Sequence, residues 1–225
     1  MKLAIVLLTY ERFEYAERTL IEAMNNIRFT GEIGVHIADD GSGGDHIERL
    51  ARCAADHRHL RGPVSSSDSM RGGYGKSYNL ATQQVHEWAD YVLPLEDDWV
   101  LERPLNLDPL CSALDTEEVG CIRLGYIGFT QELRGRLANI AGEQYLIFDP
   151  DSEERHVFAG HPRLETVKWQ RALGPWPEGL NPGETEFTVA GWPAAREGVA
   201  WPISLTGSHG PFGHIGAIQA RTDQR

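Results

Sequence analysis

Three apolar runs punctuate the first hundred residues, and each has the length of a β-strand. The run at residues 3–8 is continuous, which is typical of a strand covered on both faces, and the other two strands are expected at 33–38 and 89–95. Between the runs, apolar residues recur every three or four positions, which indicates helices packed along one face. These helices are expected at 13–27, at 45–57, and from the Gly-rich turn at 72–75 to about residue 88. Together with a weak strand near Val64, this alternation predicts βαβ units and a mainly parallel sheet.

The pattern changes after about residue 100, where strands no longer alternate with helices. Further strands are expected at 119–126, 144–148 and 156–159, and helices are expected at 163–173 and from about Gly183. The tail, residues 207–225, is rich in Gly and polar residues and is expected to form a loop or a lid.

The charge balance limits the partners of this chain. Its 225 residues indicate one domain at roughly 150 residues per domain. Lys and Arg number 21 and Asp and Glu number 33, so the net charge is −12, and bulk electrostatics do not favour binding to a phosphate polymer. Residues 49–76 differ, because six basic and two acidic side chains give this segment a local charge of +4. Such a segment suits a diphosphate.

Cysteine usage and the apolar runs bear on the compartment. The three cysteines are widely spaced and form neither a disulfide framework nor a Cys-type zinc site. We therefore expect a reducing, cytoplasmic environment. No apolar run reaches the ~18 residues that span a bilayer, and residues 1–10 fit a buried first strand better than a signal peptide. No stable membrane association is expected.

Acidic residues follow two of the predicted strands. Glu96, Asp97 and Asp98 come directly after the third apolar run, and Asp39 and Asp40 come after the second. The carboxyl ends of parallel strands meet at one rim of the sheet, where such folds bind ligands. Adjacent carboxylates repel each other unless a cation neutralises them, and clustered oxygen ligands suit Mg²⁺ or Mn²⁺. The competing interpretations are a solvated acidic turn for the first cluster and a helix cap for the second.

Four short motifs follow one another along this part of the chain. They are Thr9-Tyr10-Glu11-Arg12, Asp39-Asp40-Gly41-Ser42, the helix start Gly75 to Asn79, and Glu96-Asp97-Asp98. Their order resembles that of the family 2 type of glycosyltransferases with the GT-A fold, which carry Thr-Tyr-Asn-Arg, Asp-Asp-Gly-Ser, a Gly…Arg-Asn helix start and Asp-X-Asp at these places. Three positions depart from the family pattern, namely Glu11, Tyr78 and Glu96.

This resemblance implies a fold and a separate role for each half of the chain. The fold would be α/β, a Rossmann-like GT-A fold with a mainly parallel central sheet, helices on both faces and an irregular C-terminal acceptor region. Residues 1–100 would be the nucleotide-sugar-binding half. Residues 101–225 would be the acceptor-binding and catalytic half of the same single domain, with a flexible loop from about 207.

The resemblance also implies a donor site and a metal site. Asp39 would read the base and Asp97 would lie at the ribose of a nucleoside diphosphate sugar, with a UDP-sugar as the expected donor. Asp98 would hold Mn²⁺ or Mg²⁺, which neutralises charge on the departing diphosphate. The whole set expected to bind the donor is Thr9, Tyr10, Arg12, Asp39, Asp40, Lys76, Asn79 and Asp97.

The second half must supply a base for the acceptor. Glu184 and Glu186 lie near a predicted helix start and resemble the family's acidic segment, in which a carboxylate deprotonates the acceptor hydroxyl. We favour Glu186. The alternative is that both carboxylates only stabilise the first turn of the helix through its dipole.

Two histidines in the tail are candidate metal ligands. His209 and His214 lie in a Gly-rich stretch, and some GT-A enzymes are similar in taking a metal ligand from a C-terminal loop. We favour His214, because His-Ile-Gly resembles a tail motif of the family. The alternative is that both are solvated or capping side chains.

The main hypothesis is a metal-dependent glycosyltransferase that moves a hexosyl or pentosyl group to a hydroxyl acceptor, with inversion. The acceptor stays open among a small molecule, a protein side chain and a modified DNA base. Two alternatives are a nucleotidyltransferase acting on a sugar phosphate and a non-catalytic nucleotide-sugar-binding module. The first normally has a Gly-rich, basic loop after the first strand, and the second would bind a donor without turnover.

Overall fold

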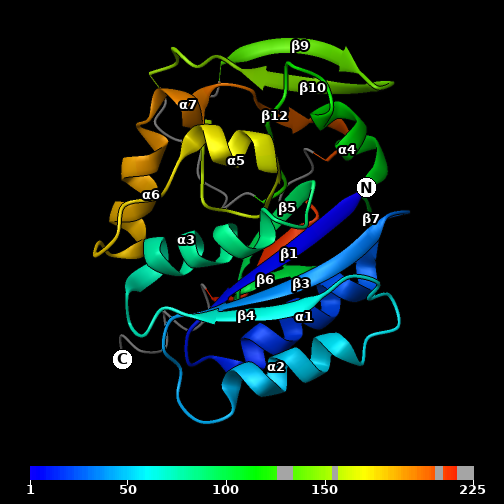
Figure 1. Ribbon diagram of the computed structural model, residues 1–225. Coiled ribbons are helices and arrows are strands. Elements are labelled where there is room, and N and C mark those ends of the chain that lie inside the picture. The colour runs from blue at the N-terminus through cyan, green and yellow to red at the C-terminus, as the bar shows by residue number, and fades with distance from the viewer. Residues whose placement is uncertain (126–133, 154–156, 206–209, 217–225) are drawn as a thin grey trace.

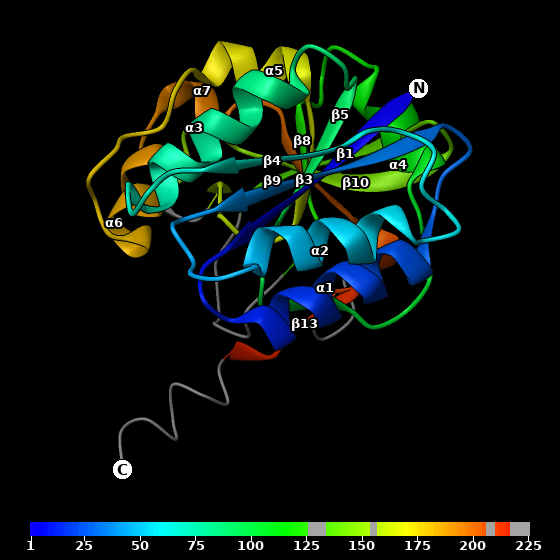
Figure 2. The same cartoon turned by 60° about the horizontal axis from the view of Figure 1, so that its bottom comes forward.

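A twisted sheet crosses the whole molecule and carries helices on both faces (Figures 1 and 2). The computed structural model describes residues 1–125, 134–153, 157–205 and 210–216. The helices are α1 (Phe13–Asn26), α2 (His46–Ala55), α3 (Gly73–Val85), α4 (Asp108–Leu114), α5 (Val167–Leu173), α6 (Pro182–Ala190) and α7 (Pro193–Arg196). The strands are β1 (Lys2–Thr9), β2 (Ile27–Arg28), β3 (Glu32–Asp39), β4 (Val64–Asp68), β5 (Tyr91–Glu96), β6 (Trp99–Leu101), β7 (Leu105–Asn106), β8 (Cys121–Arg123), β9 (Gly135–Ile140), β10 (Glu143–Phe148), β11 (Arg163–Thr166), β12 (Val199–Pro202) and β13 (Phe212–His214).

Strand β1 shows why a continuous apolar run forms the centre of the sheet. Side chains alternate between the two faces of a strand. Leu3, Ile5 and Leu7 pack into one core with α1 and α2, while Ala4 and Val6 pack into a second core with α3 and α5. Both cores exclude water, so neither face of β1 tolerates polar residues. Figure 2 shows α1 and α2 below the sheet and α3 and α5 above it.

Parallel pairing is concentrated in the first half of the sheet. Among the described residues, nine strands form one sheet in the order β4-β3-β1-β5-β11-β8-β12-β10-β9. The neighbours from β4 to β5 are all parallel, and Thr9 pairs with Asp39 while Leu8 pairs with Glu96. The three strand ends therefore meet at one rim, as predicted. The second half is mixed, with β11 antiparallel to both β5 and β8.

Two predicted elements of the second half are wrong. The predicted helix at 163–173 begins only at Val167, because Arg163–Thr166 forms β11 inside the sheet. Residues 157–159, the described part of the predicted strand at 156–159, do not form a strand. The helix expected near Gly183 is confirmed as α6.

The tail expected as a loop or lid is partly a strand. Phe212–His214 forms β13, which pairs with β6 so that His214 lies opposite Trp99. Ile215 N donates to the carbonyl of Asp98 at 2.9 Å. Residues 207–209 and 217–225 of the predicted loop lie outside the described residues.

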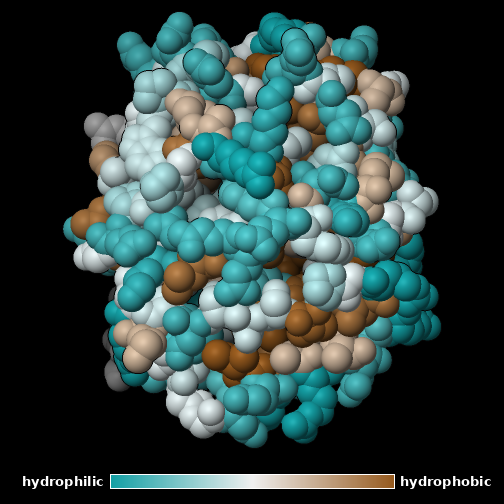
Figure 3. Space-filling view, in the orientation of Figure 1, coloured by the Kyte–Doolittle hydropathy of each residue, from teal (hydrophilic) through white to brown (hydrophobic). Residues whose placement is uncertain are grey.

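The surface in the view of Figure 1 is mostly hydrophilic, and hydrophobic residues reach it in a band between β4 and α2 (Figure 3). Leu60 and Val64 are partly buried against the core, so β4 ends the sheet without fully covering the core. None of the described helices has the length and apolar character needed to cross a bilayer.

Candidate functional site

A cavity of about 570 Å³ opens at the rim where β1, β3 and β5 end. Its lining combines strand-end residues with residues from α3 and the start of α6. The lining residues are Leu8, Thr9, Tyr10, Glu11, Arg12, Ala38, Asp40, Tyr74, Ser77, Glu96, Asp97 and Pro182. Five of the predicted site residues thus line one cavity, namely Thr9, Tyr10, Arg12, Asp40 and Asp97, and Glu96 of the acidic cluster joins them.

A strained turn after β1 directs Arg12 into the site. Glu11 has a φ of 56°, in the left-handed region that non-glycine residues rarely adopt. Its amide donates to Ser42 Oγ at 2.7 Å, and the amide of Arg12 donates to the Tyr10 carbonyl at 2.7 Å. Such strain persists only where surrounding contacts hold it. The result is that the Arg12 guanidinium reaches both Asp97 and Asp98.

Asp97 is buried and surrounded by donors. It forms an ion pair with Arg12, and its Oδ2 accepts from Thr9 Oγ1 at 3.3 Å and from the Tyr10 amide at 3.4 Å. Thr19 Oγ1 fixes the Asp97 backbone by donating to its carbonyl at 2.8 Å. Burial raises the pKa of Asp97 to about 6, and Arg12 lowers it in part. These contacts hold the carboxylate at the mouth of the cavity.

Glu96 has a raised pKa, which the sequence did not predict. Burial raises its pKa to about 7, and the charges of Asp98 and Glu186 act in the same direction, while Tyr74 and Arg163 act against it. Asp98, two residues after Glu96, and Glu186, on α6, therefore both lie close enough to Glu96 to raise its pKa.

Asp98 has an oxygen available for a ligand. Its Oδ2 accepts from Arg12 Nη1 at 3.0 Å and lies 3.5 Å from His214 Nε2. Its Oδ1 is buried and finds no hydrogen-bond partner among the described residues. Burial raises the pKa of Asp98, but the hydrogen bond of His214 and the charge of Arg12 outweigh this effect and lower it overall.

The C-terminal segment packs directly against this carboxylate. A Cβ at Gly216 would collide with the Asp98 side chain, so glycine permits the close approach. The hydrogen bond to Asp98 raises the pKa of His214, whose Nδ1 is buried without a described partner. Asp98 and His214 are thus adjacent. His209, the other predicted ligand, lies outside the described residues. In the described part of the chain, no three His, Cys, Asp or Glu side chains cluster as metal ligands.

The two aspartates after β3 are placed differently. Asp39 is fully buried, and its carboxylate accepts from the amides of Gly41 and Ser42 at 3.0 and 2.7 Å. Asp40 lines the cavity, and its Oδ1 accepts from the Gly73 amide at 2.8 Å. Of the pair, Asp40 therefore faces the space where a ligand would lie, and Asp39 shapes the turn.

Lys76 and Asn79 are on α3, and neither lines the cavity. The amide group of Asn79 bonds both the N–H and the carbonyl of Trp176, at 2.8 and 2.9 Å, and also Glu178 at 3.0 Å. Asn79 thereby ties α3 to the segment before α6. Tyr74 and Ser77, on the same helix, do line the cavity. Tyr74 was not predicted as a site residue, because the sequence shows it only as an aromatic residue inside a Gly-rich turn.

The two glutamates at the start of α6 are also placed differently. Glu184 completes a capping box with Asn181, in which each side chain bonds the other residue's backbone amide. Glu186 points inward, and its Oε1 accepts from the Gly160 amide at 2.6 Å. An ideal Cβ on Gly160 would lie 3.4 Å from the Glu186 carboxyl and 3.5 Å from the Tyr74 hydroxyl. Glu186 therefore adjoins the cavity lining, whereas Glu184 caps the helix.

Solved structures that bind nucleotide sugars share this fold. S. aureus TarS matches 89% of this chain with a TM-score of 0.63 and 18% identity, and it has also been solved in complex with UDP-GlcNAc. GalNAc-T7 with UDP, GalNAc and Mn²⁺ matches 95% with a TM-score of 0.64 and 15% identity. The mannosyltransferase PcManGT from Pyrobaculum calidifontis, with GDP-Man and Mn²⁺, matches 88% with a TM-score of 0.53 and 15% identity.

These similarities establish the GT-A fold, in agreement with the predicted fold class. The present chain spans 35% of the TarS chain, 44% of the GalNAc-T7 chain and 56% of the PcManGT chain. By sequence, neither a family model nor a curated protein matches it.

Proposed function

We propose that this protein is a metal-dependent glycosyltransferase that moves a sugar from a nucleoside diphosphate sugar to a hydroxyl acceptor, with inversion. One observation carries the proposal. On a GT-A fold, Asp97 lines a cavity of nucleotide size and shares the Arg12 guanidinium with the adjacent Asp98. An inward-facing carboxylate, Glu186, lies on α6, whose first residue also lines the cavity. Residues 1–100 supply most of the donor side of this site, and residues 101–225 supply Glu186 and His214.

The donor is proposed to be a UDP-sugar. Asp40 and Asp97 present carboxylates at the cavity, and Asp97 would accept from ribose hydroxyls. The Arg71 guanidinium lies over the Tyr10 ring, 4.5 Å from its centroid, at the edge of this cavity. Charge and aromatic surface are thus available for a base and a diphosphate. The TarS and GalNAc-T7 structures contain UDP-GlcNAc and UDP respectively.

The residues present fit a divalent cation. Asp98 Oδ1 is a buried carboxylate oxygen without a described partner, and the imidazole of His214 lies beside the same carboxylate. A buried oxygen of this kind is costly unless a ligand satisfies it. Asp98 and His214 would hold Mn²⁺ or Mg²⁺, with the donor's phosphate oxygens and water completing the shell. When bound, the cation stabilises negative charge on the leaving diphosphate.

Glu186 is the proposed general base. It would accept the proton of the acceptor hydroxyl while that oxygen attacks the anomeric carbon, and the bond from this carbon to the diphosphate oxygen would break on the opposite face. A single displacement of this kind inverts the anomeric configuration.

Thermal unfolding in the presence of UDP, GDP and Mn²⁺ tests the donor and metal parts of the proposal. A ligand at 100 times its Kd stabilises the folded state by about 2.7 kcal/mol, so UDP with Mn²⁺ is expected to raise the Tm by several degrees. Chelation by EDTA removes this increase. Asp98→Asn is expected to lose the metal-dependent part of the Tm increase. Asp56→Asn, at an exposed position just after α2, is the matched control.

Turnover separates an enzyme from a binding module. Wild-type protein is expected to hydrolyse a UDP-sugar slowly, or to transfer its sugar, only when Mn²⁺ is present. Tight binding of UDP and Mn²⁺ without any turnover would favour the binding module. The absence of any metal-dependent stabilisation by a nucleotide would contradict the proposal altogether.

A further inference from the structure

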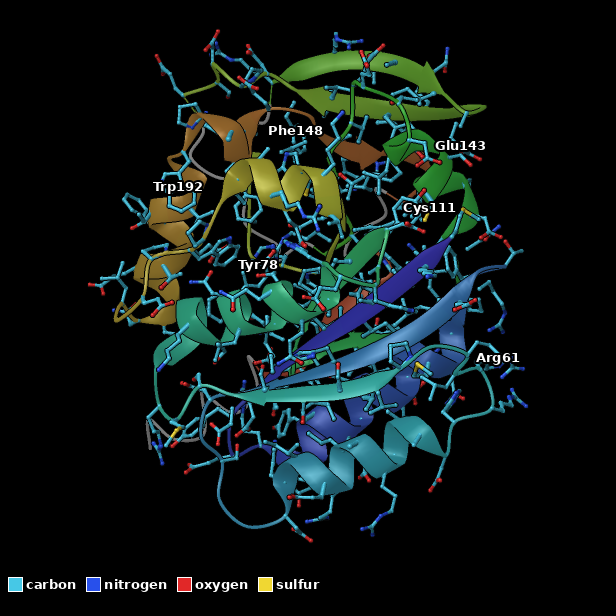
Figure 4. The ribbon with its side chains drawn as sticks, in the orientation of Figure 1. Arg61, Tyr78, Cys111, Glu143, Phe148 and Trp192 are labelled. Atoms are coloured by element: carbon cyan, nitrogen blue, oxygen red, sulfur yellow. The ribbon has the colours of Figure 1, made fainter. Side chains whose placement is uncertain are left out.

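A buried ion pair lies behind the proposed base. Arg163 and Glu165, both on β11, are fully buried and pair with each other. Glu165 Oε2 also accepts from Tyr78 Oη at 3.0 Å and from Gln170 Nε2 at 2.6 Å. Figure 4 shows Tyr78 between α3 and α5, so the pair is held from two helices as well as from the sheet.

Arg163 is also confined by aromatic rings. Its guanidinium carbon lies 5.3 Å from the centroid of Trp176, 5.0 Å from Phe158 and 5.6 Å from Tyr78. Rings on several sides, together with the Glu165 carboxylate, fix the orientation of the guanidinium plane.

The other end of the guanidinium holds the backbone that contacts the base. Arg163 Nη1 donates to the carbonyl of Gly160 at 2.8 Å. The amide of the same glycine donates to Glu186 Oε1 at 2.6 Å. One residue thus joins a fixed guanidinium to the carboxylate proposed to act as base, through two short hydrogen bonds.

We infer that Arg163, anchored by Glu165, is a positioning residue that fixes the orientation of the Glu186 carboxylate through Gly160. This inference rests on the proposed function for the role of Glu186. Stability alone does not account for the pair, because well-packed apolar side chains often replace buried ion pairs without loss of stability. An apolar side chain could not hold the Gly160 carbonyl.

Arg163→Lys is the central variant. Lysine keeps the positive charge beside Glu165 but lacks the fork that bonds a carboxylate and a carbonyl together. A crystal structure of this variant is expected to show Glu186 released from the Gly160 amide. With the sugar nucleotide that stabilises the wild type most among UDP-GlcNAc, UDP-GalNAc and GDP-Man, kcat for Mn²⁺-dependent hydrolysis is expected to fall on the order of 100-fold. The KM for this donor is expected to stay within about twofold, because the donor side of the cavity does not include Arg163.

A double-mutant cycle distinguishes positioning from simple weakening of the fold. If Arg163 acts only through Glu186, the Arg163→Lys/Glu186→Gln double variant loses no more kcat than Glu186→Gln alone. Thr166→Ala removes the side-chain cap of α5 in the same segment and serves as the control. It is expected to lower the Tm without changing kcat.

Glu165→Gln covers the case in which Arg163→Lys does not fold. This variant keeps the shape of the side chain and weakens only the anchor of Arg163, so kcat is expected to fall in the same direction and by less. The inference would be overturned if the losses of kcat in Arg163→Lys and Glu186→Gln multiply in the double variant. It would also be overturned if Glu186 is still bonded to Gly160 in the structures of Arg163→Lys and Glu165→Gln. A wild type without metal-dependent nucleotide binding or hydrolysis would instead overturn the proposed function, and the variant structures would still decide whether Arg163 orients Glu186.

Discussion

Two glutamates on α6 show how position alone separates structural from chemical roles. Glu184 and Glu186 are two residues apart and have the same side chain. Residues two apart on a helix do not share a face, so one closes the capping box and the other points at Gly160. From the sequence, both glutamates are candidate bases, because an acidic residue near the start of a helix can either stabilise the helix end or act as a general base.

We expect Glu186→Gln to lower kcat by roughly 10²–10⁴-fold, the usual contribution of a general base, while the Tm is retained. Glu184→Gln is the matched control, because glutamine also completes a capping box. Its kcat and Tm are expected to equal those of the wild type. Rates of Mn²⁺-dependent donor turnover measure the difference, and equal losses in both variants would argue against Glu186 as the base.

His36 gives the fold a pH dependence of its own. Its ring nitrogens lie 2.9 Å from the hydroxyl oxygens of Ser65 and Ser67 on β4, and burial lowers its pKa to about 4. The unfolded chain binds a proton on this side chain near pH 6.5, before the folded chain does. The contribution of neutral His36 to the free energy of unfolding is therefore fully present above pH 6.5 and is lost as the pH falls toward 4.

The size of that loss is about 3 kcal/mol, at 1.36 kcal/mol per pKa unit. Urea unfolding of the wild type and of His36→Gln at pH 7 and pH 4.5 measures it. The wild type is expected to lose more free energy of unfolding than the variant over this interval. Equal losses would show that His36 is not held neutral in the folded protein.

At the scale of elements, the strands and helices of the first hundred residues were predictable because the apolar positions in the sequence are the positions buried in the fold. The apolar runs became buried parallel strands, and the strand ends met at one rim. The strand β11 was not predictable in this way. Its charged residues Arg163 and Glu165 neutralise each other inside the protein, so a polar pattern typical of a helix surface fills a buried strand. Only tertiary contacts decide this outcome.

The site divides along the same line. Thr9, Arg12 and Asp97 were predictable, since they lie at or within three residues of the ends of strands in the parallel half. The difference between Asp39 and Asp40 was not, because it depends on which side of the turn each carboxylate faces. The placement of His214 depends on pairing between β13 and β6, and a three-residue strand carries too short a pattern to be seen in the sequence.

The packing of the C-terminal segment against β6 has a measurable consequence. Any side chain at Gly216 would displace the Asp98 carboxylate or the segment itself. We expect Gly216→Ala to weaken Mn²⁺ binding in the presence of UDP by about tenfold or more, while the Tm of the metal-free protein changes little. Gly43→Ala, at an exposed position where a Cβ would meet no atom within 4 Å, is the control for adding a methyl group. Titration of Mn²⁺ by calorimetry compares the two, and equal affinities would show that Asp98 tolerates the shift.

At the scale of the whole molecule, the sheet joins the two proposed halves. β11 lies between β5 of the first half and β8 of the second, so the central hydrogen-bonded ladder crosses from one to the other. Both hydrophobic cores likewise draw on residues from before and after residue 100. A ligand bound to the first half should therefore stabilise the second.

Cysteine labelling tests this coupling. Burial raises the pKa of Cys111 to about 12 and that of Cys121 well above its ordinary value, whereas Cys53 is only partly buried. Figure 4 shows Cys111 on α4, outside the proposed donor half. Burial and Glu17 also raise the pKa of Cys53. Because Cys53 is partly exposed, we expect it to react with a thiol reagent first and the other two only on unfolding. UDP and Mn²⁺ at 100 times their Kd should slow the labelling of Cys121 by about 100-fold if the chain unfolds as one unit. An unchanged rate would show that the halves unfold independently.

Arg12 carries a consequence for the order of events at the site. Its guanidinium already occupies Asp97 and one oxygen of Asp98, so the rim holds a built-in monovalent counterion before any divalent one arrives. A cation without a nucleotide gains little binding free energy beside two carboxylates that Arg12 already partly neutralises. A cation chelated to a diphosphate brings negative charge with it, and Arg12 can pair with that charge. In the proposed function, the protein would therefore bind the cation together with the nucleotide, and free metal alone would bind weakly.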